Sequence, residues 1–161
     1  MKNENVDFNI SDVITTELIS VDLRADTKKE AIEELTELLV IKGDVTDRQA
    51  FIDDVVLRES EGITGLGQGI AIPHGKSQAV KNTSLAIGIS QHGIEWESLD
   101  DELVSVIILF AVKDTDANTL HIRLLQKVAI LLADDNFITK LHEIKDKEEL
   151  IKLLNRKTKE V

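Results

Sequence analysis

LVSVIILFAV, residues 103–112, is apolar nearly throughout and predicts a β-strand at the centre of a sheet. A strand with one exposed face alternates apolar and polar side chains, whereas this run places apolar side chains on both faces, so both faces must be covered. SLAIGIS, residues 84–90, predicts a second strand. Helical patterns precede and follow these strands. We therefore expect an α/β fold in which helices flank both sides of a mixed β-sheet.

Two helices are predicted before the strands. Thr27 and Glu30 form a capping box that opens a helix over residues 27–42, and Gly43 ends it. Thr46 and Gln49 repeat the pattern and open a second helix, which we expect to end near residues 58–59. Apolar spacing predicts further helices over residues 10–18, 119–133, 136–142 and 147–155, and a short strand over residues 19–23.

Length and composition restrict the remaining possibilities. The 161 residues are typical of one domain, so we expect residues 1–161 to form a single unit with residues 1–9 as a loose tail. The absence of cysteine excludes disulfides, thiolate metal sites and cysteine nucleophiles. The net charge of −11 argues against nucleic acid as a partner. The N-terminus is polar and no run approaches the about 20 apolar residues of a membrane span, which predicts a cytoplasmic protein without membrane insertion.

RESEGITGLGQGIAIPHGK, residues 58–76, is the stretch with the strongest functional signal. It contains five of the eight glycines, and the only proline, Pro73, directly precedes His74. Glycine-rich segments pack poorly, which indicates that something other than stability explains this composition. The run IAIPHG changes from a short apolar strand pattern to a proline and then an imidazole, and we expect a polar connection after it. We interpret His74 as a displayed nucleophile and the glycine loop as a cradle around it.

A phosphoryl group is the cargo that best suits this segment. A neutral imidazole is a good nucleophile, and backbone N–H groups of a glycine-rich turn can approach phosphate oxygens closely. Other residues could complete the site: Arg58 and Glu59 at the helix end, the Thr64 hydroxyl, the turn formed by Gly65, Gly67 and Gly69, and His121 in the first turn of a later helix. Taken alone, His121 is equally well explained as a capping or solvent-facing residue. His92 and His142 are expected to lie on the surface.

Other site types lack their signatures. GLGQG has neither the spacing of a P-loop nor that of a dinucleotide fingerprint, and its helix precedes it. The chain also lacks the H-E-x-x-H motif of zinc hydrolases and the G-x-S-x-G elbow of serine hydrolases. We therefore expect neither a metal nor a cofactor.

The segment resembles a known signature. Glu59, six residues, Leu66-Gly67, two residues and then residues 70–75 (IAIPHG) are similar to the motif of EIIA domains of the fructose/mannitol family, from the bacterial sugar phosphotransferase system. The motif LHIRLL, residues 120–125, also fits that family, and the resemblance covers residues 10–154. It implies that His74 accepts a phosphoryl group on Nε2 from the phosphohistidine of HPr and passes it to a cysteine of an EIIB domain. It also implies that His121 and Arg58 line the site.

Two functions fit this resemblance. The first is a sugar-specific phosphocarrier, and the second is a regulatory, nitrogen-type EIIA that acts by phosphorylation-dependent protein binding. A third interpretation, an α/β domain with an incidental glycine loop, requires that the histidine never be phosphorylated.

Overall fold

The computed structural model describes residue 10, residues 13–116 and residues 120–155, so the expected tail lies outside the described part. The helices are α1 (Lys28–Lys42), α2 (Arg48–Glu61), α3 (Leu120–Leu132), α4 (Asp135–His142) and α5 (Lys147–Asn155), with 3₁₀ turns η3 (Thr16–Leu18) and η4 (Asp114–Asp116). The strands are β1 (Ile19–Ser20), β2 (Gly65–Gly67), β3 (Ile70–Ala71), β4 (His74–Ser77), β5 (Ser84–Ile94) and β6 (Val104–Lys113).

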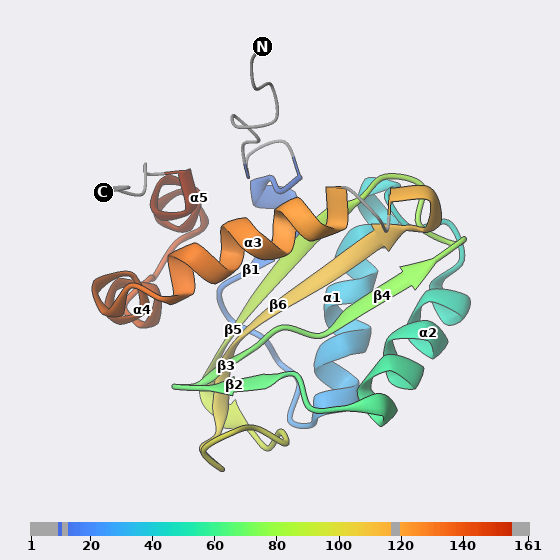
Figure 1. Cartoon of the computed structure of the whole chain (residues 1–161). Helices are drawn as coiled ribbons and strands as arrows, with labels where there is room; N and C mark the ends of the chain where they lie inside the picture. The colour runs from blue at the N-terminus through green and yellow to red at the C-terminus, as the bar shows by residue number, and fades with distance from the viewer. Residues whose placement is uncertain (1–9, 11–12, 117–119, 156–161) are drawn as a thin grey trace.

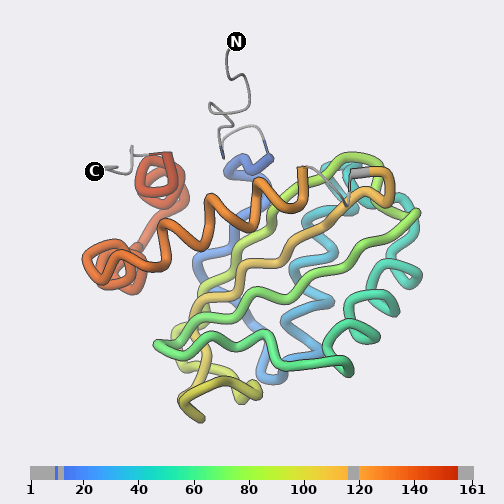
Figure 2. Tube along the Cα trace, viewed as in Figure 1, coloured from blue at the N-terminus to red at the C-terminus, as the bar shows by residue number. Residues whose placement is uncertain are grey.

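One mixed sheet organises the molecule around β6. The strand order is β1-β5-β6-β3-β2, and β4 also pairs with β6. β5 is antiparallel to β6, whereas β3 and β4 are parallel to it. Both β3 and β4 therefore follow the same edge of β6, one after the other, as the chain trace shows (Figure 2). The central position predicted for residues 103–112 is confirmed, because nearly every residue of β6 is buried.

Helices cover both faces of the sheet, as predicted (Figure 1). α1 and α2 lie on one face, where α1 packs against β5 and α2 against β4, and α3 crosses the opposite face. The longest helix in the described part of the chain, α1, has 15 residues. Within the described residues, no helix combines the length and apolar character needed to cross a membrane.

The helix boundaries agree with the sequence in part. Thr27 caps α1 as expected, accepting a hydrogen bond from the Glu30 backbone N–H. The N-cap predicted for the second helix was wrong by one residue. Asp47 caps α2, while the Thr46 hydroxyl donates a hydrogen bond to the Ala79 carbonyl. α2 also continues to Glu61, two residues past the predicted end. The helix predicted over residues 10–18 is not formed in its described part, which has only the short turn η3.

Candidate functional site

His74 begins β4, directly after Pro73, and pairs in register with Phe110 of β6. Its Nδ1 lies 3.1 Å from the Ile72 carbonyl oxygen. Since a carbonyl can only accept, Nδ1 carries the proton and donates it to this bond. The other ring nitrogen, Nε2, therefore holds a free lone pair in the neutral imidazole. The backbone of the β3–β4 connection thus selects the tautomer in which Nε2 keeps the lone pair that a nucleophile needs.

The strand alternation of β4 separates its side chains between two faces. A Cβ added at Gly75 would meet Val55 Cγ2 at 2.7 Å and Phe51 Cε1 at 2.9 Å, so this position faces α2. Successive strand residues point to opposite faces, which turns His74 and Lys76 away from the α2 contact. Glycine at position 75 lets α2 approach the strand that carries His74.

His121 of α3 lies beside His74. The centroids of the two imidazole rings are 5.5 Å apart, and Phe110 contacts both, with centroid distances of 6.0 Å to His74 and 6.3 Å to His121. The Nε2 atom of His121 is buried and has no hydrogen-bond partner among the described residues. A buried polar atom of this kind is costly to leave unpaired, so the position favours a bound group that supplies a partner.

A cavity of about 420 Å³ brings the two histidines together with α2. The cationic residues that line it are Arg58 and Lys76, and its other lining residues are Asp54, Leu57 and Glu61. Arg58 Nη1 donates to the Gly62 carbonyl at 3.3 Å, at the end of the helix. A guanidinium has five N–H donors, so this bond leaves most of them for an anion. The cavity therefore combines an imidazole nitrogen that has a free lone pair with two cationic side chains, alongside the two carboxylates Asp54 and Glu61.

Both histidines favour the neutral state. Burial lowers the pKa of His74; its bond to the Ile72 carbonyl opposes this effect, and the positive charge of Arg58 adds to the lowering. Burial also lowers the pKa of His121, and the nearby His74 and Lys76 lower it further. A neutral imidazole is the form that can attack an electrophile.

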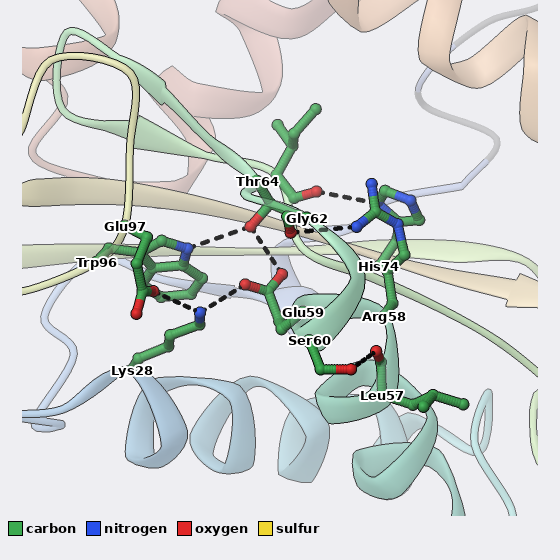
Figure 3. A network of polar contacts seen from close by, with 11 residues as sticks. Lys28, Leu57, Arg58, Glu59, Ser60, Gly62, Thr64, His74, Trp96 and Glu97 are labelled. Atoms are coloured by element: carbon green, nitrogen blue, oxygen red, sulfur yellow. Dashed lines mark hydrogen bonds and ion pairs between the residues drawn. The ribbon is translucent and has the colours of Figure 1, made fainter.

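Thr64 and Glu59 do not face the cavity as the sequence interpretation expected. Thr64 is 3% exposed, and its hydroxyl donates to Glu59 Oε2 at 2.7 Å while it accepts from Trp96 Nε1 at 3.1 Å (Figure 3). The Glu59 carboxylate also forms an ion pair with Lys28, at 2.7 Å. The hydroxyl is therefore occupied inside the protein: Glu59, five residues away, accepts the hydrogen bond that the hydroxyl could otherwise donate to a phosphate oxygen, and Trp96, 32 residues away, donates to its oxygen.

The three glycines of the expected cradle lie on the β2–β3 hairpin instead. An added Cβ at Gly65 would clash with Ser98 Cβ, one at Gly67 would meet Asp100 Oδ2 at 3.1 Å, and one at Gly69 would meet His142 Cε1 at 3.0 Å. Among the described residues, none of the three lines the cavity at His74. Their small size instead allows the hairpin to pack against the segment that follows β5 and against the end of α4.

The remaining histidines have structural contacts. The His92 side chain is 51% exposed and lies 3.1 Å from Asp26. His142 Nε2–H donates to the Gln68 carbonyl at 2.7 Å, and its Nδ1 is 3.3 Å from Ser105 Oγ. His142 thus fastens the β2–β3 turn to α4, a role that the sequence did not indicate.

Lys76 is the cationic cavity residue that the sequence interpretation missed, and Asp54, Leu57 and Glu61 were not named for the site either. Residues after His74 were expected to form a polar connection, but they continue as β4. With a strand at this position, the period of two would have placed Lys76 on the same face as His74. The described residues contain no group of three or more His, Cys, Asp or Glu side chains placed to hold a metal ion.

Comparison with known proteins identifies the family of this architecture. Residues 12–157 match the model of the phosphoenolpyruvate-dependent sugar phosphotransferase system, EIIA 2 family. A 2-O-alpha-mannosyl-D-glycerate-specific EIIABC component of Escherichia coli is 32% identical over 159 residues, which are 97% of this chain and 24% of that protein. The chain thus spans about a quarter of that relative. The fructose-specific EIIA component of Haloferax volcanii is 34% identical over 140 residues, covering 87% of this chain and 90% of that protein.

Solved structures share the fold. The nitrogen regulatory protein IIA-Ntr of Neisseria meningitidis superposes with a TM-score of 0.82 at 28% identity, covering 90% of this chain and 98% of that one. The mannitol enzyme IIA of Escherichia coli, in its complex with phosphorylated enzyme IIB, has a TM-score of 0.73 at 26% identity, covering 88% of this chain and 96% of that one.

Proposed function

Because this chain belongs to the EIIA type 2 family of the phosphoenolpyruvate-dependent sugar phosphotransferase system, we propose that His74 carries a phosphoryl group from HPr to an EIIB domain. The observation that carries this proposal is the bond from His74 Nδ1–H to the Ile72 carbonyl, which leaves Nε2 free in a cavity with two cations. The resemblance found in the sequence names the same nitrogen. The expected cytoplasmic location is part of this proposal.

The first transfer is an exchange of one phosphorus–nitrogen bond for another. The Nε2 lone pair of His74 attacks the phosphorus of phosphohistidine in HPr, and the donor bond breaks with its electron pair returning to the donor imidazole. His74 keeps its Nδ1 proton throughout, bonded to the Ile72 carbonyl. The hydrogen bond to that carbonyl stabilises the positive charge that forms on the phosphorylated ring.

The second transfer reverses the roles of the atoms. A cysteine thiolate of the EIIB domain attacks the phosphorus, a sulfur–phosphorus bond forms, and the electron pair of the broken bond returns to His74 Nε2. The solved complex between a mannitol enzyme IIA and its phosphorylated enzyme IIB supports a partner of this kind. Phosphohistidine is itself a reactive donor, so the protein must supply mainly alignment and positive potential.

Three neighbours of His74 suit the charge that moves during transfer. Arg58 can bind two phosphoryl oxygens with parallel N–H donors, and Lys76 adds a point charge to the same cavity. His121 Nε2, which is buried without a partner among the described residues, gains one if a phosphoryl oxygen reaches it. These groups are in place before the donor arrives, which is the arrangement that stabilises a transition state most effectively.

Labelling from phosphoenolpyruvate tests the proposal directly. The purified protein is incubated with phosphoenolpyruvate, enzyme I and HPr, and the acid-labile phosphate on it is measured. We expect one phosphate per chain in the wild type and none in His74→Ala. The matched control is His92→Ala, since His92 is half-exposed, lies 3.1 Å from Asp26 and does not line the cavity, and it should be labelled like the wild type. Label that survives in His74→Ala would contradict the assignment.

A regulatory role is the second candidate. The observation in its favour is the shape of the fold, because the nitrogen regulatory protein superposes with a TM-score of 0.82, against 0.73 for the mannitol protein. Transfer from the phosphorylated chain to a panel of fructose-type and mannitol-type EIIB domains separates the two functions. Transfer to one of them supports the sugar-specific function, whereas stable phosphorylation without transfer to any supports the regulatory one.

A further inference from the structure

A chain of polar contacts links Trp96, Thr64, Glu59 and Lys28, close to His74 and Arg58 (Figure 3). Trp96 Nε1–H donates to Thr64 Oγ1 at 3.1 Å, and the Thr64 hydroxyl donates to Glu59 Oε2 at 2.7 Å. The other carboxylate oxygen, Glu59 Oε1, lies 2.7 Å from Lys28 Nζ. An indole N–H can only donate and a carboxylate can only accept, so the direction of the Thr64 hydroxyl is determined. The Thr64 hydroxyl is thus bonded on both sides, whereas Glu59 Oε1 is held by the ion pair with Lys28 and has no hydrogen-bond partner among the described residues.

The backbone of Thr64 extends this chain to the reacting imidazole. The Ile72 N–H donates to the Thr64 carbonyl at 3.0 Å, and the Ile72 carbonyl accepts from His74 Nδ1 at 3.1 Å. The position of Thr64 therefore sets the position of Ile72, and Ile72 sets both the orientation and the tautomer of His74. The Thr64 side chain never needs to contact the phosphoryl group to affect its transfer.

The same chain fixes the end of α2. Glu59 follows Arg58 in the last turns of that helix, so an anchored Glu59 limits how far the Arg58 backbone can move. Lys28, in the first turn of α1, holds Glu59 and also bonds to Glu97 Oε1 at 2.8 Å. The Lys28 ammonium lies 5.3 Å from the centre of the Trp96 ring. Lys28 thus joins α1, the end of α2 and the segment after β5.

We propose that Lys28 and Trp96 are positioning residues of the phosphoryl site, although neither lines its cavity. They hold Glu59 and Thr64, which in turn keep the Nε2 of His74 presented for attack with Arg58 beside it. This inference rests on the proposed function, because it assigns these residues to the same transfer. It also makes a separate statement about the tautomer of His74, which can be measured without any phosphoryl donor.

Thr64→Val is the central test. Valine keeps the shape of threonine but removes the hydroxyl, so it separates Trp96 from Glu59 and loosens the contact to Ile72. We expect the maximal rate of phosphoryl acceptance to fall about tenfold, as small displacements of reacting groups do, while the KM for phosphorylated HPr stays unchanged. Thr64→Ser keeps the hydroxyl and should restore the rate. Thr36→Val is the matched control, because Thr36 is also buried, and its Oγ1 has no partner among the described residues.

Lys28→Met is a second, independent test, which remains informative even if Thr64→Val does not fold. The Lys28 side chain is 25% exposed, so its replacement leaves no fully buried gap, and Lys28→Arg should restore the rate by keeping both carboxylate contacts. In both loss variants, Thr64→Val and Lys28→Met, the ¹⁵N chemical shifts of His74 should change from the values of an Nδ1-protonated ring to those of a mixture of tautomers. A structural role alone would lower thermal stability without moving these shifts.

The outcomes are separable from those of the proposed function. A lower maximal rate with a mixed tautomer, rescued by the conservative variants, supports the inference. Wild-type rate and wild-type ¹⁵N shifts in either loss variant overturn it. If the wild type accepts no phosphate at all, the proposed function fails, and the ¹⁵N shifts in the same variants still decide whether the chain positions His74.

Discussion

At the scale of single residues, the reactivity expected of His74 depends on its neutral form. Burial lowers its pKa below the ordinary 6.5, and Arg58 lowers it further against the opposing bond to Ile72. We therefore expect an NMR titration of His74 to give a midpoint below 6.5, and phosphoryl acceptance to persist at pH values where a free imidazole is protonated. Arg58→Gln should move the midpoint upward. A wild-type midpoint at or above 6.5 would contradict this account.

The lowered pKa of His74 also makes the stability of the folded protein depend on pH. The unfolded chain takes up a proton near pH 6.5, before the folded protein does, so protonation favours unfolding. The contribution of His74 and His121 to stability is thus fully present above pH 6.5 and is lost as the pH falls through their lowered folded pKa values.

Sequence alone identified His74 because the residues around it are unusual, but it placed the partners less well. Arg58 and His121 were named, and the structure does bring both to the cavity. Thr64 was assigned to the phosphate because its hydroxyl stands in a glycine-rich segment, whereas the decisive partner, Trp96, is 32 residues away. Contacts over such a separation depend on strand pairing, which no local pattern reveals.

At the scale of elements, the fit between β4 and α2 depends on Gly75. An alanine Cβ at this position would lie 2.7 Å from Val55 Cγ2 and 2.9 Å from Phe51 Cε1, so the helix or the strand must shift. We expect Gly75→Ala to lower the free energy of unfolding by about 1–3 kcal/mol in urea denaturation. Gly62→Ala is the control, since its added Cβ would meet only Arg58 Nη1, at 3.8 Å. Equal stability of the two variants would refute the close fit.

The elements that the sequence predicted well are those with a strong apolar pattern. β6 and α1 were placed to within a residue or two because burial determines their composition. β2 was taken for a loop, since glycine has little strand propensity, yet it pairs with β3 in the folded chain. β4 was missed because its four residues, HGKS, show no apolar alternation, and pairing with β6 alone makes them a strand.

At the scale of the whole molecule, charge should govern how partners arrive. The chain has a net charge of −11, while its cavity is lined by two cationic side chains, Arg58 and Lys76, and two acidic ones, Asp54 and Glu61. A donor with a basic docking face around its phosphohistidine would match both features and be steered into contact. We expect kcat/KM for transfer from phosphorylated HPr to fall as the ionic strength rises above about 0.15 M, with kcat nearly constant, because salt screens the approach of the partners and not the transfer within the complex. Phosphoryl-transfer assays at a series of salt concentrations measure both kcat and kcat/KM. If kcat/KM is independent of salt, the acidic surface plays no part in the encounter, and apolar contacts must then guide docking.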